Sequence, residues 1–267
     1  MALVELEHAS KSYARRAGWR TEMRPVVEDI SFTIKPGETL GLVGESGSGK
    51  TTVARMLLGL VAPSSGSVRV DGIDLARASA DEMRRLRRQM QPVSQDPFAA
   101  LNPRMRVFDI VAEPWRIHSE DERSPRGATA QRAAAIDLLR SVGLDESALP
   151  RYPHEFSGGQ RQRINIARAL ALQPRLLILD EPVSALDVSV GAQIVNLLRA
   201  LQHEHRLTYL FISHSMPLVR YLSTRIAVME RGCLVEIGEA EALCAAPREA
   251  YTRQLIEATP ELPAGAA

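Results

Sequence analysis

Features that identify several large classes of protein are scarce or missing in this sequence. It has only two cysteines, Cys233 and Cys244, which lie far from any metal-ligand spacing, so we expect reduced thiols without assigned chemistry. Lys and Arg number 33 against 32 Asp and Glu, a net charge of +1, which gives no electrostatic reason to expect nucleic acid or an acidic partner. No apolar run of about 18 residues occurs, so we expect that this chain does not itself cross a membrane. Any membrane role would therefore come through partners.

The first ten residues also lack the pattern of a secretory signal. They mix Glu5 and Glu7 with apolar residues and have neither the basic start nor the apolar stretch of a secretory signal. At 267 residues, with 45% hydrophobic and 24% charged, the composition is that of a globular chain with a full core. The one strong basic run, at 84–88, is interpreted as a solvated helix face.

Strand and helix patterns alternate along the chain and are interrupted by a long helical stretch. Short apolar or alternating runs predict strands at Leu3–Glu7, Ile30–Ile34, Thr39–Val43, Ser67–Val70, Leu176–Leu179, Thr208–Ile212 and Arg225–Met229. Helical spacing predicts helices over 51–60, 81–89, 107–117, 128–142, 158–172 and 191–203. The polar stretch Arg15–Pro25 is predicted to be a surface loop, and the tail from Pro260 to be frayed. This order predicts an α/β fold, with a mostly parallel sheet covered by helices and a helical insertion.

A glycine-rich phosphate loop follows the predicted strand at 39–43. Its glycines let successive backbone N–H groups point at one phosphate, and the following helix adds the positive end of its dipole. Lys50 would reach the β- and γ-phosphates, and Thr51 would ligate Mg²⁺. The residues assigned to nucleotide binding here are Gly44, Glu45, Ser46, Gly47, Ser48, Gly49, Lys50, Thr51 and Thr52.

Two carboxylates stand at the end of a second apolar strand, Leu176–Asp180 followed by Glu181. Asp180 is suited to a water-mediated contact with Mg²⁺. Glu181 is suited to be the base that polarises an attacking water. The alternative for such a pair is an acidic strand end that faces solvent.

The segment Phe156–Gln160 is a second glycine-rich candidate for phosphate contact. Ser157 is predicted to cap the next helix, leaving a free hydroxyl and bare N–H groups, which is anion-binding geometry. Nothing else on the same chain pairs with this contact. The segment therefore predicts an active site shared between two chains, to which we assign Ser157, Gly158, Gly159 and Gln160.

Taken together, these motifs make the chain resemble an ATP-binding subunit of an ABC transporter over about residues 3–260. The loop at 44–51 matches the family's Walker A motif, Leu176–Asp180 its Walker B strand, and Ser157–Gln160 its signature sequence. The resemblance implies a single domain with a P-loop NTPase (RecA-like) core at about 3–95 and 173–240. It also implies an antiparallel β edge near the N-terminus, a helical subdomain at about 96–172 and a C-terminal extension at 241–267.

Other elements of the family match one residue at a time. Tyr13 is placed where the family stacks an aromatic ring on adenine, and Gln95 matches the glutamine that contacts Mg²⁺ and water. Asp187 ends the segment Ser184–Asp187, which crosses the dimer interface in this family. His214 matches the switch histidine near the γ-phosphate. The resemblance therefore implies Glu181, His214 and Gln95 as catalytic residues, and Thr51, Gln95 and Asp180 as the Mg²⁺ contacts.

The segment Gln95–Arg104 is similar to that of the dipeptide, oligopeptide and nickel importer branch, as are the insertion Arg15–Val27 and the C-terminal Pro247–Pro260. Some positions depart from the branch. Ser94 replaces an aromatic residue, Ser215 an acidic one, and Glu249-Ala250 a His-Pro pair; a longer cysteine-bearing tail is missing. These departures leave ATP turnover unaffected but weaken the choice between peptide and nickel.

The resemblance implies a peripheral ATPase on the cytoplasmic face of a bacterial cell membrane. Its implied partners are a second ATP-binding subunit, identical or different, two transmembrane permease subunits and an extracytoplasmic solute-binding protein, with no nucleic acid. Its implied ligands are ATP and Mg²⁺, and its implied function is the uptake of di- and oligopeptides. The alternatives are import of nickel or another small solute, and a soluble ABC-type ATPase that acts on ribosomes or DNA.

Overall fold

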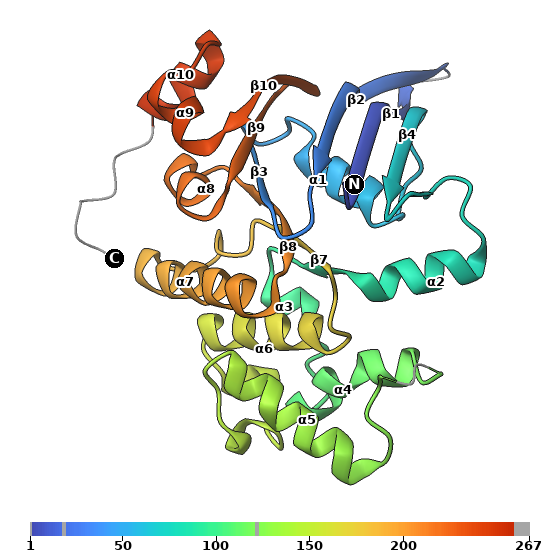
Figure 1. Ribbon diagram of the computed structural model, residues 1–267, viewed down its shortest axis with the longest axis vertical. Helices are drawn as coiled ribbons and strands as arrows, with labels where there is room; N and C mark the ends of the chain where they lie inside the picture. The colour runs from blue at the N-terminus through green and yellow to red at the C-terminus, as the bar shows by residue number, and fades with distance from the viewer. Residues whose placement is uncertain (1, 18–19, 121–122, 259–267) are drawn as a thin grey trace. The chain divides into compact units, whose positions relative to one another are not determined.

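The computed structural model describes residues 2–17, 20–120 and 123–258 (Figure 1). The chain divides into two compact units, one formed by Met1–Leu86 with Thr208–Ala267 and the other by Arg87–Leu207. The two units are described separately below. The tail predicted to be frayed, from Pro260, lies outside the described residues.

The first unit contains an antiparallel sheet with the strand order β2-β1-β4-β5. Val4 in β1 pairs with Ile34 on one side and with Val70 on the other, and all three side chains are buried. This sheet confirms the antiparallel β edge predicted near the N-terminus. Its strands are β1 (Val4–Ala17), β2 (Arg20–Ile34), β4 (Ser65–Val70) and β5 (Ile73–Asp74).

The prediction of a surface loop over Arg15–Pro25 was wrong for the described part of this stretch, and residues 18–19 lie outside it. Strands β1 and β2 continue as a hairpin in which Ala14 pairs with Met23 and Arg15 with Glu22. These four residues are exposed, so the strands carry no apolar alternation there. Because alternation is the sequence signal for a strand packed on a core, a hairpin that extends beyond the core has no such signal.

In the second sheet of this unit, the buried strand β3 lies between β8 and β9 (Figure 1). Strand β3 is parallel to β8 and β9, and β10 pairs antiparallel with β9. Every residue of β3 and β8 is buried, as expected for strands covered on both faces. The strands are β3 (Thr39–Val43), β8 (Thr208–Ser213), β9 (Arg225–Glu230) and β10 (Cys233–Glu239), and the helices are α1 (Lys50–Leu57), α8 (Met216–Leu222), α9 (Ala240–Ala245) and α10 (Ala250–Glu257).

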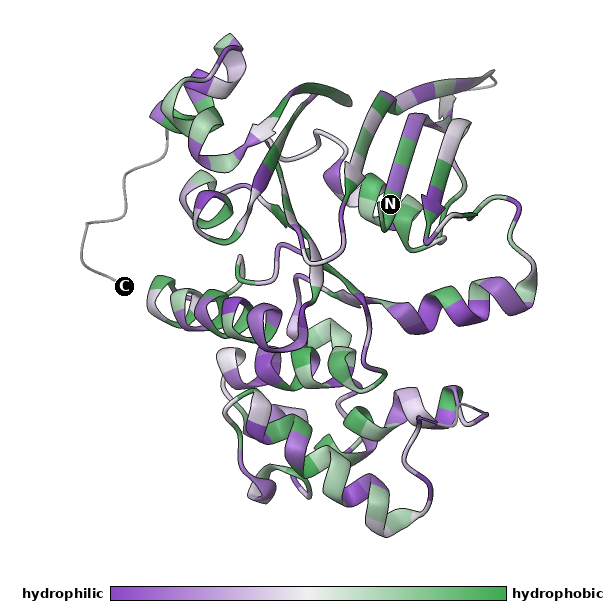
Figure 2. Ribbon diagram, viewed as in Figure 1, coloured by the Kyte–Doolittle hydropathy of each residue, from purple (hydrophilic) through white to green (hydrophobic). Residues whose placement is uncertain are grey.

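Helix α2 (Ala80–Gln89) carries the basic run that was expected on a solvated face. Figure 2 shows this helix as mostly hydrophilic. Arg84, Arg85 and Arg87 are exposed, while Leu86 is buried.

The second unit is mainly helical and contains one pair of parallel strands, β6 and β7. Strand β6 was not predicted, because Pro92 within it removes a backbone donor and argues against a strand. The helical core includes Trp115, whose indole N–H donates to the carbonyl of Ala171 at 2.7 Å. The elements are β6 (Met90–Val93), α3 (Pro97–Ala100), α4 (Val107–Ile117), α5 (Ala128–Ser141), η1 (Glu146–Ala148), η2 (Pro153–Glu155), α6 (Gly158–Leu170), β7 (Leu176–Asp180) and α7 (Val188–His205).

Among the described residues, no helix combines the length and apolar character needed to span a membrane.

Candidate nucleotide-binding site

The phosphate loop connects β3 to α1, which is the strand-to-helix context predicted for it. Gly47 and Gly49 have φ angles of 85° and 104°, in the left-handed region that favours glycine. A Cβ atom on Gly49 would also lie 2.7 Å from the carbonyl oxygen of Val26. The tight turn that presents the loop's N–H groups therefore depends on glycine at these positions.

Lys50 folds back into this loop and is only 5% exposed. Its ammonium donates to the carbonyl oxygens of Gly44 at 2.7 Å and Glu45 at 2.8 Å, and contacts the hydroxyl of Ser48 at 3.4 Å. All three acceptors are neutral, so a phosphate oxygen at this place would attract the ammonium more strongly than they do. Thr51 is exposed at the start of α1, whereas Thr52 is buried.

The C-terminal helix α10 also contacts the phosphate loop. The backbone N–H of Glu45 donates to the hydroxyl of Tyr251 at 3.1 Å. Burial raises the pKa of Tyr251, and the carboxylate of Glu236 in β10 accepts from the backbone N–H groups of Arg248 and Glu249 at the start of the helix. Tyr251 was noted in the sequence only as part of the C-terminal peptide, and no site role was predicted for it.

We expect Tyr251→Phe to weaken ATP binding by about 5-fold. The ring would stay in place while the loop loses one hydrogen bond, which is typically worth about 1 kcal/mol. Titration of the purified variant with a fluorescent ATP analogue would measure this change. An unchanged melting temperature would show that the fold is intact, and an unchanged affinity would contradict the prediction.

Tyr13 lies in β1, opposite Arg24 of β2. Its ring is partly exposed, and the Lys11 ammonium lies 5.3 Å from the ring centroid. Among the described residues, its buried hydroxyl has no hydrogen-bond partner. The stacking of this ring on adenine stays a prediction.

His214 follows the last residue of β8 and is exposed. The hydroxyl of Ser213 accepts from the backbone N–H of Ser215 at 3.1 Å, which fixes the turn that carries the histidine into α8. The predicted position at a strand end is confirmed. Its role at a γ-phosphate stays a prediction.

In the second unit, the predicted acidic pair stands at the end of β7. Asp180 is the last strand residue and Glu181 follows it, with both side chains partly buried. Glu181 has a φ of 48°, in the left-handed region that non-glycine residues rarely adopt. Its carbonyl oxygen accepts from the backbone N–H and the hydroxyl of Ser184, at 3.2 and 3.1 Å. The strand thus ends in a sharp turn that carries the carboxylates.

Ser157 caps helix α6, as the sequence predicted, but its hydroxyl is not free. It accepts from the backbone N–H of Gln160 at 3.3 Å, and the Gln160 side chain accepts from the Ser157 N–H at 3.0 Å. This reciprocal arrangement is a capping box, in which each side chain accepts from the backbone N–H of the other residue. A Cβ on Gly159 would lie 2.4 Å from Val190 of α7, so this glycine permits close packing of the two helices.

Asp187 is the N-cap of helix α7 and is exposed. Its carboxylate accepts from the backbone N–H of Val190 at 3.0 Å and from the hydroxyl of Ser189 at 2.9 Å. These hydrogen bonds hold the pKa of Asp187 below its usual value. The segment predicted to face a second subunit therefore ends in an ionised helix cap.

Gln95 lies in an exposed bend between β6 and α3. The next residue, Asp96, caps α3 by accepting from the backbone N–H of Phe98 at 2.8 Å. The bend places Gln95 at the surface with its amide accessible.

A buried polar chain within α6 was missed from the sequence. Gln162 donates to the Pro182 carbonyl at 2.7 Å, and Asn165 contacts Gln162 at 3.4 Å. Arg168 donates to Asn165 at 2.9 Å and to the Ala100 carbonyl at 2.6 Å, and burial lowers its pKa. The sequence did contain a signal for these contacts. Polar residues recur at every third position, 162, 165 and 168, on one face of a predicted helix.

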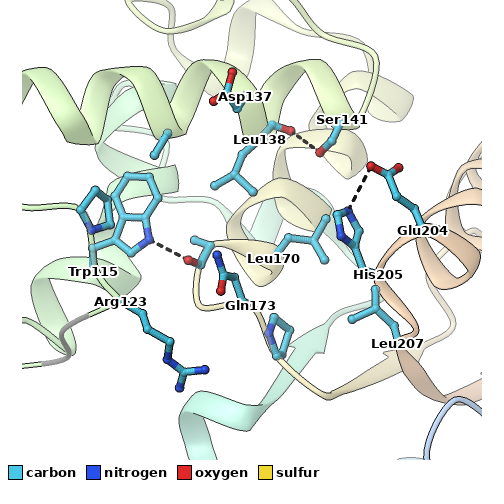
Figure 3. Close-up of a pocket in the computed structure, with 14 residues that line it drawn as sticks. Trp115, Arg123, Asp137, Leu138, Ser141, Leu170, Gln173, Glu204, His205 and Leu207 are labelled. Atoms are coloured by element: carbon cyan, nitrogen blue, oxygen red, sulfur yellow. Dashed lines mark hydrogen bonds and ion pairs between the residues drawn. The ribbon is translucent and has the colours of Figure 1, made fainter.

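The second unit also contains a cavity of about 660 Å³, shown in Figure 3. Trp115, Leu170 and Leu207 are among its apolar lining residues, and Glu204 and His205 line it as exposed residues whose side chains lie 4.0 Å apart. None of the predicted site residues lines it. This cavity is therefore distinct from the residues assigned to nucleotide.

Comparisons with known proteins agree with the motifs. Residues 27–184 match the family model described as "ABC transporter". The chain is 49% identical to the "Probable peptide ABC transporter ATP-binding protein y4tS" of Sinorhizobium fredii, over 97% of this chain and 73% of that protein. It is 46% identical to the "Oligopeptide transport ATP-binding protein OppF" of Streptococcus mutans, over 97% of this chain and 82% of that protein.

Among solved structures, the chain is similar to a dimeric post-hydrolysis state of the ATP-binding cassette MJ0796 bound to ADP and Pi. The TM-score is 0.77 and the identity 29%, over 89% of this chain and 98% of that one. It is also similar to cbiO1 from Clostridium perfringens, part of the complex cbiONQ, with a TM-score of 0.78 and 25% identity over 91% of each chain.

Proposed function

This chain belongs to the ABC transporter family as an ATP-hydrolysing subunit, and on that premise we propose that it powers the import of di- and oligopeptides. The observation that carries the proposal is the match along 97% of the chain to proteins named for peptide and oligopeptide transport. That similarity favours peptides over nickel or another small solute. It also argues against a soluble ATPase that acts on ribosomes or DNA.

ATP binding is assigned first to the phosphate loop, Gly44–Thr52, with Tyr13 stacking on adenine. Lys50 already lies within the loop with its ammonium on two carbonyl oxygens. On binding, the β- and γ-phosphates would replace these neutral acceptors, because their negatively charged oxygens attract the ammonium more strongly than carbonyl oxygens do. His214 would then donate to the γ-phosphate.

Hydrolysis is assigned to Glu181, with Gln95 and His214 orienting the attacking water. Glu181 would accept a proton from the water while the water oxygen attacks the γ-phosphorus, and ADP would leave. The turn after β7, fixed by Ser184, holds the Glu181 backbone in one conformation. Such positioning is the main contribution that a protein makes to phosphoryl transfer.

Mg²⁺ fits this set of residues. Thr51, Gln95 and Asp180 all offer oxygen donors, which are the ligands that Mg²⁺ prefers. Mg²⁺ also keeps several of its ligand positions for nucleotide phosphates and water. When bound, the ion would neutralise charge that develops on the phosphate oxygens.

A second ATP-binding subunit, identical or different, would complete each site. Ser157, Gly158, Gly159, Gln160 and Asp187 of one chain are assigned to the nucleotide bound by the other. The N-terminus of α6 supports this proposal because the first backbone N–H groups of a helix have no partner within the helix and suit an anion. Closure of the two subunits on ATP would then draw their helical units together.

The remaining partners are two transmembrane permease subunits and an extracytoplasmic solute-binding protein, with the chain held on the cytoplasmic face of a bacterial cell membrane. In this proposal Gln95 and the segment to Arg104 transmit closure to the permease. The chain would act as one ATP-binding domain over 3–260. Its core would be at about 3–95 and 173–240, its helical subdomain at 96–172 and its extension at 241–267.

Reconstitution tests the proposal. The chain, its permease subunits, binding protein and ATPase partner would be placed in proteoliposomes with ATP on the side of the ATPase. We expect uptake of labelled di- or oligopeptide to depend on ATP, and labelled Ni²⁺ not to be taken up. ATP-dependent uptake of Ni²⁺ alone would favour the alternative, and no uptake of either would reject import of both.

A further inference from the structure

Arg161, in the first turn of α6, joins two segments that flank predicted site residues. Its guanidinium carbon lies 3.9 Å from the centroid of the Phe98 ring. Its Nε–H donates to the carbonyl of Pro153 at 2.7 Å, and another N–H donates to the carbonyl of His154 at 3.4 Å. One side chain thus links the segment that follows Gln95 to the turn that precedes the signature sequence.

Arg168 holds the same segment at a second point, two helical turns further along α6. Its guanidinium donates to the carbonyl of Ala100 at 2.6 Å. The buried chain through Asn165 and Gln162 continues from there to the carbonyl of Pro182. Side chains of helix α6 therefore contact the segment 98–100 through Arg161 and Arg168. Through Gln162 the same helix also contacts Pro182, the residue after Glu181.

Phe98 is accessible to contact by a partner protein. It is 60% exposed, although Pro97 and Leu101 beside it are buried. The buried neighbours anchor the short helix α3, and one guanidinium covers the ring, so the aromatic remains at the surface in a fixed place. A cation over an aromatic face is a directional contact that responds to ring displacement.

We propose that Arg161 is a positioning residue that couples the permease to the signature sequence. An apolar side chain of a permease loop pressing on Phe98 displaces the Arg161 guanidinium, and with it the turn before Ser157. The permease contact rests on the proposed import function. The link from Phe98 to α6 is a property of this chain alone.

The link can be tested without the permease by amide hydrogen exchange on the full chain. We expect ATP to slow exchange at the N–H groups of Phe98 and Ala100, which donate hydrogen bonds to Asp96. We expect Arg161→Ala to abolish this slowing without affecting ATP binding. Arg163→Ala is the matched control, because Arg163 lies on the same helix but donates to the carbonyl of Val142. Equal slowing in the Arg161 and Arg163 variants, or none in the natural protein, would overturn the proposal.

The reconstituted complex then tests the coupling. Arg161→Ala and Phe98→Leu should each lower permease-stimulated ATP hydrolysis about 5- to 10-fold, a size typical of residues that carry coupling, while the rate of the isolated chain stays within about 2-fold. Phe98→Tyr keeps the aromatic face and should restore stimulation, and the double variant should lose no more than either single one. Full stimulation of Arg161→Ala would overturn the proposal. Absence of stimulation in the natural complex would instead reject the import function, leaving the exchange result to decide on the link.

Discussion

Glu181→Gln should lower ATP hydrolysis by about 100-fold or more while ATP still binds. Removal of a positioned general base typically costs this much, and glutamine keeps the size and shape of the side chain. Because ATP would then persist, the variant should accumulate as a closed dimer with ATP trapped at the shared sites. Phosphate release would measure the rate, and size-exclusion chromatography with ATP would measure the dimer.

The matched control for this variant is Glu204→Gln. Glu204 is an exposed carboxylate on α7, beside the cavity and not among the predicted site residues. It should hydrolyse ATP at the natural rate and remain monomeric under the same conditions. Normal turnover by Glu181→Gln would remove Glu181 from the role of base.

Lys50→Met should weaken ATP binding by about 10- to 100-fold. A hydrogen bond to a charged group contributes about 1.5–3 kcal/mol, and methionine replaces the buried stem without the ammonium. The same change frees the carbonyls of Gly44 and Glu45, which Lys50 now occupies. The rise in melting temperature on adding ATP would report the loss, because a ligand that binds only the folded state stabilises it by an amount that grows with the logarithm of the ligand concentration divided by Kd.

Lys35→Met provides the comparison, since Lys35 is an exposed lysine at the turn before β3. It removes the same charge and should leave the effect of ATP on the melting temperature unchanged. An equal ATP response in the Lys50 variant and the natural protein would contradict the assignment of this loop to nucleotide.

The parts of the fold that were predictable are those where one physical signal dominates. The strands β3 and β8 are covered on both faces, so they read as apolar runs, and the helix at 107–117 was predicted with its observed bounds. The phosphate loop was found because its glycines have to adopt conformations that other residues avoid. In each case a local requirement limits the residue types directly.

The parts that were not predicted depend on contacts distant in sequence. At Ala14, Arg15, Glu22 and Met23 the β1–β2 hairpin is held by strand pairing between exposed residues. Strand β6 contains a proline and still pairs with β7. Tyr251 lies 206 residues from the backbone N–H that it accepts from. The chain through Gln162 and Arg168 likewise joins residues that only the folded helix brings together.

The backbone at Glu181 has a consequence for how this protein can evolve. A left-handed conformation at a non-glycine residue costs about 1–2 kcal/mol, so glycine at this position would relieve strain and favour the folded state. Selection for thermal resistance alone would thus favour loss of the carboxylate, whereas selection for ATP turnover would retain it. A related sequence with glycine or asparagine at this position would be expected to fold stably and to bind nucleotide without hydrolysing it. Paired with a subunit that keeps the glutamate, it would form an asymmetric dimer with one hydrolytic site.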